Sequence, residues 1–224
     1  MTPRPFNQGD EYEHQIYQIC CESHILPAGF KRAGASAFEP DIVFIHKGQQ
    51  YSLEVKADKG ADWGQKMCKW DENTGWQWNV VDNTTKLYDE LGMLNKIDPN
   101  FVPRKFSLNR DAITLKDKRF DQENFERPNI ECPIEALFNY YAERDCYYLQ
   151  FQNYGFYHLK KDIAKLGTQQ FNGTITFRFR AKTIHSEPVY KYGFYGVLKL
   201  REKPDLSSFD INERENAEFP EIYP

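Results

Sequence analysis

The chain has 224 residues, 40% of them hydrophobic and 28% charged, which is enough to bury the core of one domain or of a core with an appendage. No run approaches the ~20 apolar residues of a membrane span, and the first residues lack the pattern of a secretory signal, so we expect a cytoplasmic protein without membrane contact. Five cysteines without a CxxC pair argue against a disulfide framework and against a structural zinc site.

The net charge of -4 hides a segregation of charge along the chain. Between His158 and Lys203 ten Lys or Arg residues face three acidic residues, a net charge of +7. From Pro204 to Pro224 six acidic residues face one Arg, a net charge of -5. Nucleic-acid affinity depends on the local positive patch and not on the total charge. The basic segment is therefore compatible with phosphate binding, although a solvated sheet face has the same composition.

Hydrophobic periodicity changes type several times along the chain and predicts a mixed α/β fold. Helices are expected at residues 10–24, 84–94, 133–143 and, briefly, 162–166. Strands are expected at 41–46, 51–55, 146–151, 174–181 and 193–200, the first two joined by a tight turn at 47–50. The proline-containing stretch 95–129 has little periodicity and is interpreted as a connector with at most one strand.

Three charged residues stand at the ends of the predicted hairpin. Pro40-Asp41 opens its first strand, and Glu54-Val55-Lys56 ends the second, 13 residues after Asp41. Side chains alternate along a strand, so Val55 faces the core while Glu54 and Lys56 share the opposite face. Asp41 enters the neighbouring strand and brings a second carboxylate alongside Glu54. An isolated Glu-x-Lys on a strand is usually a solvated charge pair, but the chain contains no other acidic-x-Lys triplet.

Two carboxylates beside a lysine suit phosphodiester hydrolysis. The reaction needs an activated water and neutralised charge on the phosphate, and hard divalent cations held by carboxylates supply much of both. We expect Asp41 and Glu54 to bind Mg²⁺, with Mn²⁺ as a substitute. Lys56 is expected to orient or help to deprotonate the water and to offset charge on the scissile phosphate.

A further acid lies on the apolar stripe of the first predicted helix. Glu13 precedes Ile16 by three residues and Cys20 by seven, so it shares their face. A carboxylate on that side is satisfied if it helps to hold the metal, which makes Glu13 a third candidate ligand. The alternative is an ordinary acid near a helix start.

These motifs together resemble the PD-(D/E)xK nuclease superfamily, which includes type II restriction endonucleases and archaeal Holliday-junction resolvases. The resemblance covers about residues 9–60, its spacing is closest to the resolvases, and it rests on Gly9-x-x-x-Glu13-x-x-Ile16, Arg32-Ala33-Gly34-Ala35-Ser36, Pro40-Asp41 and Glu54-Val55-Lys56.

The resemblance implies a restriction-endonuclease-like core, a central mixed sheet flanked by helices, and commonly a homodimer. It matches Glu13, Asp41 and Glu54 to metal-site acids and Lys56 to the catalytic lysine. It also suggests Ser36 as a phosphate contact and Gln65 as a catalytic glutamine on a helix after the lysine strand; an ordinary surface glutamine is the alternative for Gln65.

Most of the chain follows Lys56 and is expected to form structure beyond the residues that the resemblance covers. We expect a nuclease core at residues 1–95, a connector and β-rich C-terminal extension at 96–203, and a flexible acidic tail at 204–224. Basic residues of the two late strands are candidate contacts to phosphate or guanine: Arg178, Arg180, Lys182, Lys199 and Arg201. The tryptophans between Trp63 and Trp78 fit a core better than a base-stacking surface.

The sequence therefore predicts a Mg²⁺-dependent DNA endonuclease, most simply a sequence-specific restriction-type enzyme acting on duplex DNA. A structure-specific nuclease for Holliday junctions or phage recombination predicts the same active centre. A hypothesis of another class is a DNA-binding module that has the nuclease fold without its activity; the intact set of two acids and a lysine argues against it.

Overall fold

The fold is described from a computed structural model that covers residues 8–31, 39–58, 62–71, 73–97, 102–107, 112–127, 130–184 and 191–213. The chain forms two compact units, each assembled from segments distant in the sequence. Unit 1 comprises Met1–Ala61, Phe138–Gly173 and Glu202–Pro224, and unit 2 comprises Asp62–Leu137 and Thr174–Arg201. The division between Arg201 and Glu202 lies close to the predicted boundary near residue 203, whereas the division between Ala61 and Asp62 splits the predicted nuclease core at residues 1–95 between the two units.

Unit 1 is built on a mixed four-stranded sheet in the order β1-β2-β6-β7. Its strands are β1 (Ile42–His46), β2 (Gln49–Lys56), β6 (Cys146–Phe151) and β7 (Gly155–His158). β1 and β2 form an antiparallel hairpin, β2 and β6 run parallel, and β6 and β7 are antiparallel. The expected mixture of α and β structure is confirmed, and β1, β2 and β6 lie close to the strands predicted from periodicity, whereas β7 was not predicted.

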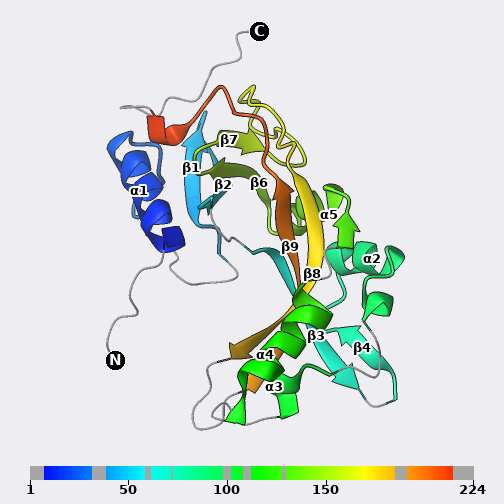
Figure 1. Cartoon of the computed structure of the whole chain (residues 1–224). Helices are drawn as coiled ribbons and strands as arrows, with labels where there is room; N and C mark the ends of the chain where they lie inside the picture. Colours follow the sequence, from blue (N-terminus) through cyan, green and yellow to red (C-terminus); the bar gives the residue numbers. More distant parts are fainter. Residues whose placement is uncertain are drawn as a thin grey trace. The chain divides into compact units, whose positions relative to one another are not determined.

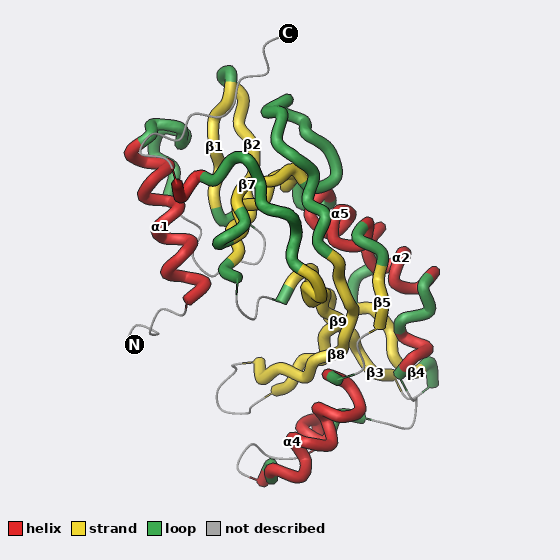
Figure 2. The backbone as a smooth tube through the Cα atoms, turned by 45° about the horizontal axis from the view of Figure 1, so that its top comes forward, coloured by secondary structure: helices red, strands yellow, loops and turns green. Residues whose placement is uncertain are grey.

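Helix α1 (Gln8–Glu22) covers one face of this sheet with the apolar stripe expected from the sequence. Tyr12, Ile16 and Cys20 are buried in one core with Leu53 and Val55. Figure 1 shows α1 beside the β1–β2 hairpin, and the turned view in Figure 2 keeps the same neighbourhood. The face of β2 that carries Leu53 and Val55 is thus occupied by α1, which leaves Glu54 and Lys56 on the other face.

The first part of the acidic tail is packed into unit 1. Phe209 and Ile211 belong to its core, and the short 3-10 helix η4 (Ile211–Glu213) follows. Gln150, which is fully buried in β6, donates to Asp210 Oδ1 at 2.6 Å and accepts from Ile211 N at 3.2 Å. The expectation of a flexible tail is thus wrong for residues 204–213, because two apolar side chains and a buried amide hold this segment; residues 214–224 lie outside the described residues.

Residues 162–166 form a turn and not the short helix that was predicted. Asp162 Oδ1 accepts from Leu166 N at 3.0 Å and Oδ2 from Gly167 N at 2.8 Å. Lys165 has a positive φ of 54°. The aspartate side chain takes the amides that a helix would pair with backbone carbonyls, which favours the turn.

Unit 2 contains a five-stranded sheet in the order β4-β3-β9-β8-β5. Its strands are β3 (Trp63–Asp71), β4 (Gly75–Trp78), β5 (Ile130–Cys132), β8 (Thr174–Ile184) and β9 (Lys191–Glu202). Trp63, Trp76 and Trp78 are buried, which confirms that most of the tryptophan cluster is core, whereas Trp70 is 38% exposed. Helix α2 (Asn83–Glu90) is capped by Asp82, and α5 (Glu135–Ala142) contains the division between the two units.

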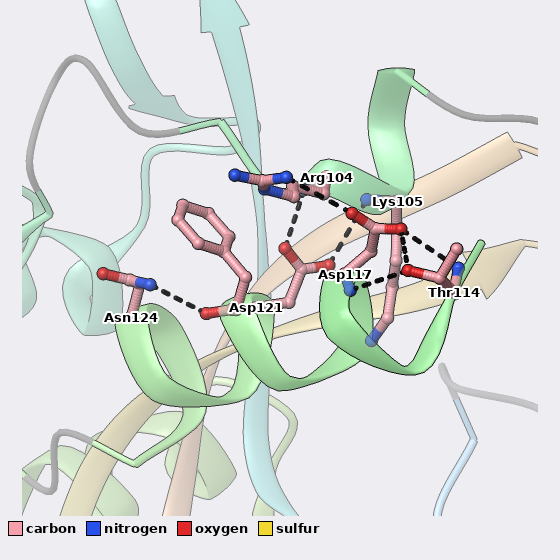
Figure 3. A network of polar contacts seen from close by, with 7 residues as sticks. Arg104, Lys105, Thr114, Asp117, Asp121 and Asn124 are labelled. Atoms are coloured by element: carbon pink, nitrogen blue, oxygen red, sulfur yellow. Dashed lines mark hydrogen bonds and ion pairs between the residues drawn. The ribbon is translucent and has the colours of Figure 1, made fainter.

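The predicted connector 95–129 contains helices, in contrast to the irregular chain expected from its prolines. They are η1 (Leu94–Lys96), α3 (Arg104–Ser107), α4 (Leu115–Asp121) and the π-helical turn η3 (Gln122–Glu126). Figure 3 shows the polar contacts that hold α3 against α4: Asp121 accepts from Arg104 N at 2.7 Å, and Arg104 Nη1 lies 3.4 Å from Asp117 Oδ1. Short helices fixed by such tertiary contacts leave little periodicity in the sequence.

No helix among these described segments combines the length and the apolar character that crossing a membrane would require. All five cysteines are free thiols, in line with the absence of a disulfide framework expected from their spacing.

Candidate active site on the β1–β2 hairpin

The β1–β2 hairpin sets the positions of the candidate residues. Lys47 and Gly48 form its two-residue loop with φ values of 49° and 77°, the left-handed conformation that matches the twist of a tight hairpin. The register pairs Ile42 with Leu53 and His46 with Gln49. Asp41 therefore sits one residue before the paired part of β1, level with the end of β2 that carries Glu54.

Asp41 is tied directly to the end of β2. Its Oδ2 accepts a hydrogen bond of 2.8 Å from Val55 N, the amide between Glu54 and Lys56. This hydrogen bond links the two strands of the hairpin just beyond their last backbone pair, Ile42 with Leu53. The structure thus brings Asp41, Glu54 and Lys56 together at one end of the hairpin, as the sequence spacing predicts.

Glu54 Oε1 receives two donors. Lys56 Nζ forms an ion pair with it, and Tyr141 OH, from α5, donates to the same oxygen at 3.1 Å. The Glu54 and Lys56 side chains are only 15% and 21% exposed, and Tyr141 is buried. Sequence reasoning missed Tyr141, although a tyrosine on the apolar face of a predicted helix signals a hydroxyl that needs a buried partner.

The pKa of Asp41 is raised by its surroundings. Burial, and then the Glu54 carboxylate, raise the pKa of Asp41 to about 7, against the opposing effects of Lys56 and of the Val55 amide. Burial alone would lower the pKa of Lys56, but Glu54 and Asp41 outweigh it and raise that pKa above its ordinary value. Lys56 is therefore an ammonium at neutral pH, which favours charge neutralisation over proton abstraction for this side chain.

Glu13 is half-buried on α1 and lies close enough to Asp41 for its charge to contribute to the raised pKa of Asp41. Within the described residues, no group of three or more His, Cys, Asp or Glu side chains is arranged to hold a metal ion. The three acids are thus not gathered as one ligand cage. Mg²⁺ in proteins commonly uses one or two carboxylates and completes its shell with water and substrate phosphate, and the Asp41–Glu54 pair with its excess negative charge fits that requirement.

Two further residues, Gln65 and Ser36, were suggested by the resemblance. Gln65 lies in strand β3 of unit 2, so the expectation that it stands on a helix after the lysine strand is wrong. A tryptophan-rich segment pairs with β9 there and takes strand form. Ser36 lies outside the described residues.

The basic residues of β8 are largely engaged with acids. Arg178 Nη2 lies 2.8 Å from Asp62 Oδ1, and Arg180 pairs with the other oxygen of the same carboxylate. Arg178 also lies 3.7 Å from Glu126. These two arginines are therefore not an uncompensated basic stripe, and their contact with DNA stays a prediction; the side chain of Lys182 is outside the described part.

On β9 the alternation of the strand places Lys199 and Arg201 on one face. Lys199 is exposed, and Arg201 Nη1 lies 2.8 Å from Glu131 in a pair that is open to solvent. Both residues line a cavity of about 490 Å³ together with Glu131, Thr176 and Leu200. Exposed ion pairs contribute little to stability, so Arg201 can leave Glu131 at little cost and pair with an anionic partner instead.

Comparisons of the chain with models of protein families, with curated proteins and with solved structures give no match.

Proposed function

We propose that the protein is a Mg²⁺-dependent endonuclease that hydrolyses phosphodiester bonds in DNA. The observation that carries the proposal is the junction of Asp41, Glu54 and Lys56 at one end of the hairpin, where burial and mutual repulsion raise the pKa of Asp41 to about 7. Perturbed carboxyl groups beside a buried cation are typical of functional sites.

Each residue has a role that follows from its chemistry. Asp41 and Glu54 would hold the metal ion, and Glu13 would add negative charge from α1 or bind through water. When bound, Mg²⁺ supplies electrophilic stabilisation of the phosphate and an acidified water. Lys56, as an ammonium beside Glu54, orients that water and offsets the charge that develops on the phosphate oxygens.

We favour a sequence-specific, restriction-type enzyme on duplex DNA, with Lys199 and Arg201 more exposed than Arg178 and Arg180 and therefore the more accessible of these predicted DNA contacts. The pairing of Arg178 and Arg180 with Asp62 leaves fewer cations for reading bases. That observation keeps a structure-specific junction nuclease as the second candidate, because such enzymes depend on backbone shape. A homodimer would offer one active site to each strand in either case.

Cleavage of a plasmid and of a synthetic four-way junction, each in Mg²⁺ and in Ca²⁺, tests the proposal. We expect Asp41→Asn and Lys56→Ala to lose at least about 100-fold in rate, while Lys161→Ala, an exposed lysine of the same unit, retains wild-type activity. Discrete fragments from the plasmid support the restriction-type enzyme, and cutting of the junction alone supports the second candidate. DNA binding without cleavage by the wild-type protein would identify an inactive binding module, and wild-type rates in both site variants would refute the active centre.

A further inference from the structure

Tyr141 is the side chain that covers the candidate site from the helical side. It lies in α5, is 2% exposed, and reaches Glu54 on the face of β2 opposite to α1. Helix α5 leads into β6, the parallel neighbour of β2, and the register places Glu54 beside Leu149. The local chain path thus fixes the hydroxyl above the carboxylate of Glu54.

The two oxygens of Glu54 differ in their surroundings. Lys56 Nζ and Tyr141 OH both meet Oε1, whereas no donor to Oε2 is found among the described residues. A carboxylate oxygen has two lone-pair positions, so two donors occupy Oε1 fully. Oε2 remains the oxygen that can bind a cation without breaking an existing contact.

The Tyr141 hydroxyl acts as a donor in this arrangement. An ionised carboxylate can only accept, so the hydroxyl supplies the proton of its 3.1 Å hydrogen bond to Glu54 Oε1. Its hydrogen bond to an ionised carboxylate belongs to the stronger class of hydrogen bonds. A donor on one oxygen restricts rotation of the carboxylate and orients the other oxygen.

We propose that Tyr141 is a positioning residue that holds Glu54 through Oε1, so that Glu54 binds the divalent cation through Oε2 alone. The inference rests on the proposed function, since it concerns the same carboxylate. Tyr141 touches neither the cation nor the DNA in this role and acts through Glu54. Its loss should therefore weaken cation binding while leaving the binding of DNA unchanged.

The test compares Tyr141→Phe with the wild-type chain by calorimetric titration with Ca²⁺ and by the Mg²⁺ dependence of cleavage. Loss of a side chain that orients a metal ligand typically weakens metal affinity 10- to 100-fold, and we expect Tyr141→Phe to fall in that range. Saturating Mg²⁺ should restore most of the cleavage rate, and the KM for DNA should not change.

Tyr157→Phe is the matched control. Tyr157 is buried in the same unit, and the hydrogen-bond partners of its hydroxyl are the carbonyl oxygens of Asp205 at 2.6 Å and of Tyr154 at 2.8 Å, not Glu54. This variant also loses a buried hydrogen bond, so it reports a merely structural effect. We expect its Ca²⁺ affinity to stay within about 2-fold of the wild type.

A double-variant comparison separates positioning from folding. In a Glu54→Gln background, adding Tyr141→Phe should weaken Ca²⁺ affinity no further, because Tyr141 acts only through the Glu54 carboxylate. A folded Tyr141→Phe protein with wild-type Ca²⁺ affinity, or a further 10-fold loss in the Glu54→Gln background, would overturn the inference. A wild-type chain that neither binds a divalent cation nor cleaves DNA would instead overturn the proposed function.

Discussion

Asp41 carries a cost of ionisation that the substitution Asp41→Asn should remove. The pKa of its carboxyl group is raised from 3.8 to about 7 by burial and then by Glu54. The folded protein therefore binds this proton more tightly than the unfolded chain, and stability falls as the pH rises through that window. At ~1.4 kcal/mol for each pH unit, the full effect is about 4 kcal/mol. Part of this cost comes from repulsion between Asp41 and Glu54. We therefore expect the free energy of unfolding of Asp41→Asn at pH 8 to exceed that of the wild type by about 2 kcal/mol.

The measurement is urea unfolding of both proteins at pH 4 and at pH 8, without divalent cations. The five histidines titrate in the same range, so only the difference between the two proteins is interpreted. The asparagine can still accept from Val55 N, which preserves the hairpin contact. We expect equal stability near pH 4, greater stability of the variant at pH 8, and a stabilisation by Mg²⁺ at pH 8 that is larger for the wild type. An equal difference at both pH values would show that Asp41 is not held in a repulsive, buried environment.

Three further substitutions test the packing around the site and in unit 2. Phe209→Ala should destabilise the chain by about 3–5 kcal/mol in urea unfolding, whereas Leu206→Ala, 71% exposed nearby, should change it by less than about 0.5 kcal/mol; equal effects would show that the C-terminal segment is not packed. Gly155→Ala should cost more than Gly48→Ala, because both have positive φ but only at Gly155 would a Cβ lie 2.7 Å from Phe209 O; a smaller loss at Gly155 would contradict this contact. Asp62→Asn should destabilise by about 3 kcal/mol, since two guanidinium groups lose their shared carboxylate, and a loss below about 1 kcal/mol would indicate that solvent already screens them.

Local patterns in the sequence were sufficient for the central part of the candidate site. The repeat of two in β2 placed Glu54 and Lys56 on one face, and the tight turn at Lys47-Gly48 returned the chain so that Asp41 met the end of that strand. The stripe of α1 likewise identified the side of the helix that is buried. These features depend on neighbours within one strand, one turn or one helix, which is the range over which side-chain periodicity carries information.

Contacts between segments that are distant in the sequence could not be predicted from local patterns. Tyr141 reaches Glu54 across 87 positions, and Arg178 reaches Asp62 across 116. The burial of Phe209, which converts the start of an acidic tail into core, depends on β7 and has no local signature. The helices of the connector are also short and are held by side-chain contacts such as those of Asp121 with α3.

The sequence by itself thus determined the acid, acid and lysine of the hairpin, the helices α1, α2 and α5, and the strands β1, β2, β6, β8 and β9, because their spacing reflects local geometry. Only the tertiary structure decided which oxygen of Glu54 is occupied, which arginines are neutralised and how the chain divides into two interleaved units. Those properties depend on the parallel pairing of β2 with β6 and on packing between residues that are distant in the sequence. Such residues meet only when the chain folds, so their contacts leave no local pattern in the sequence.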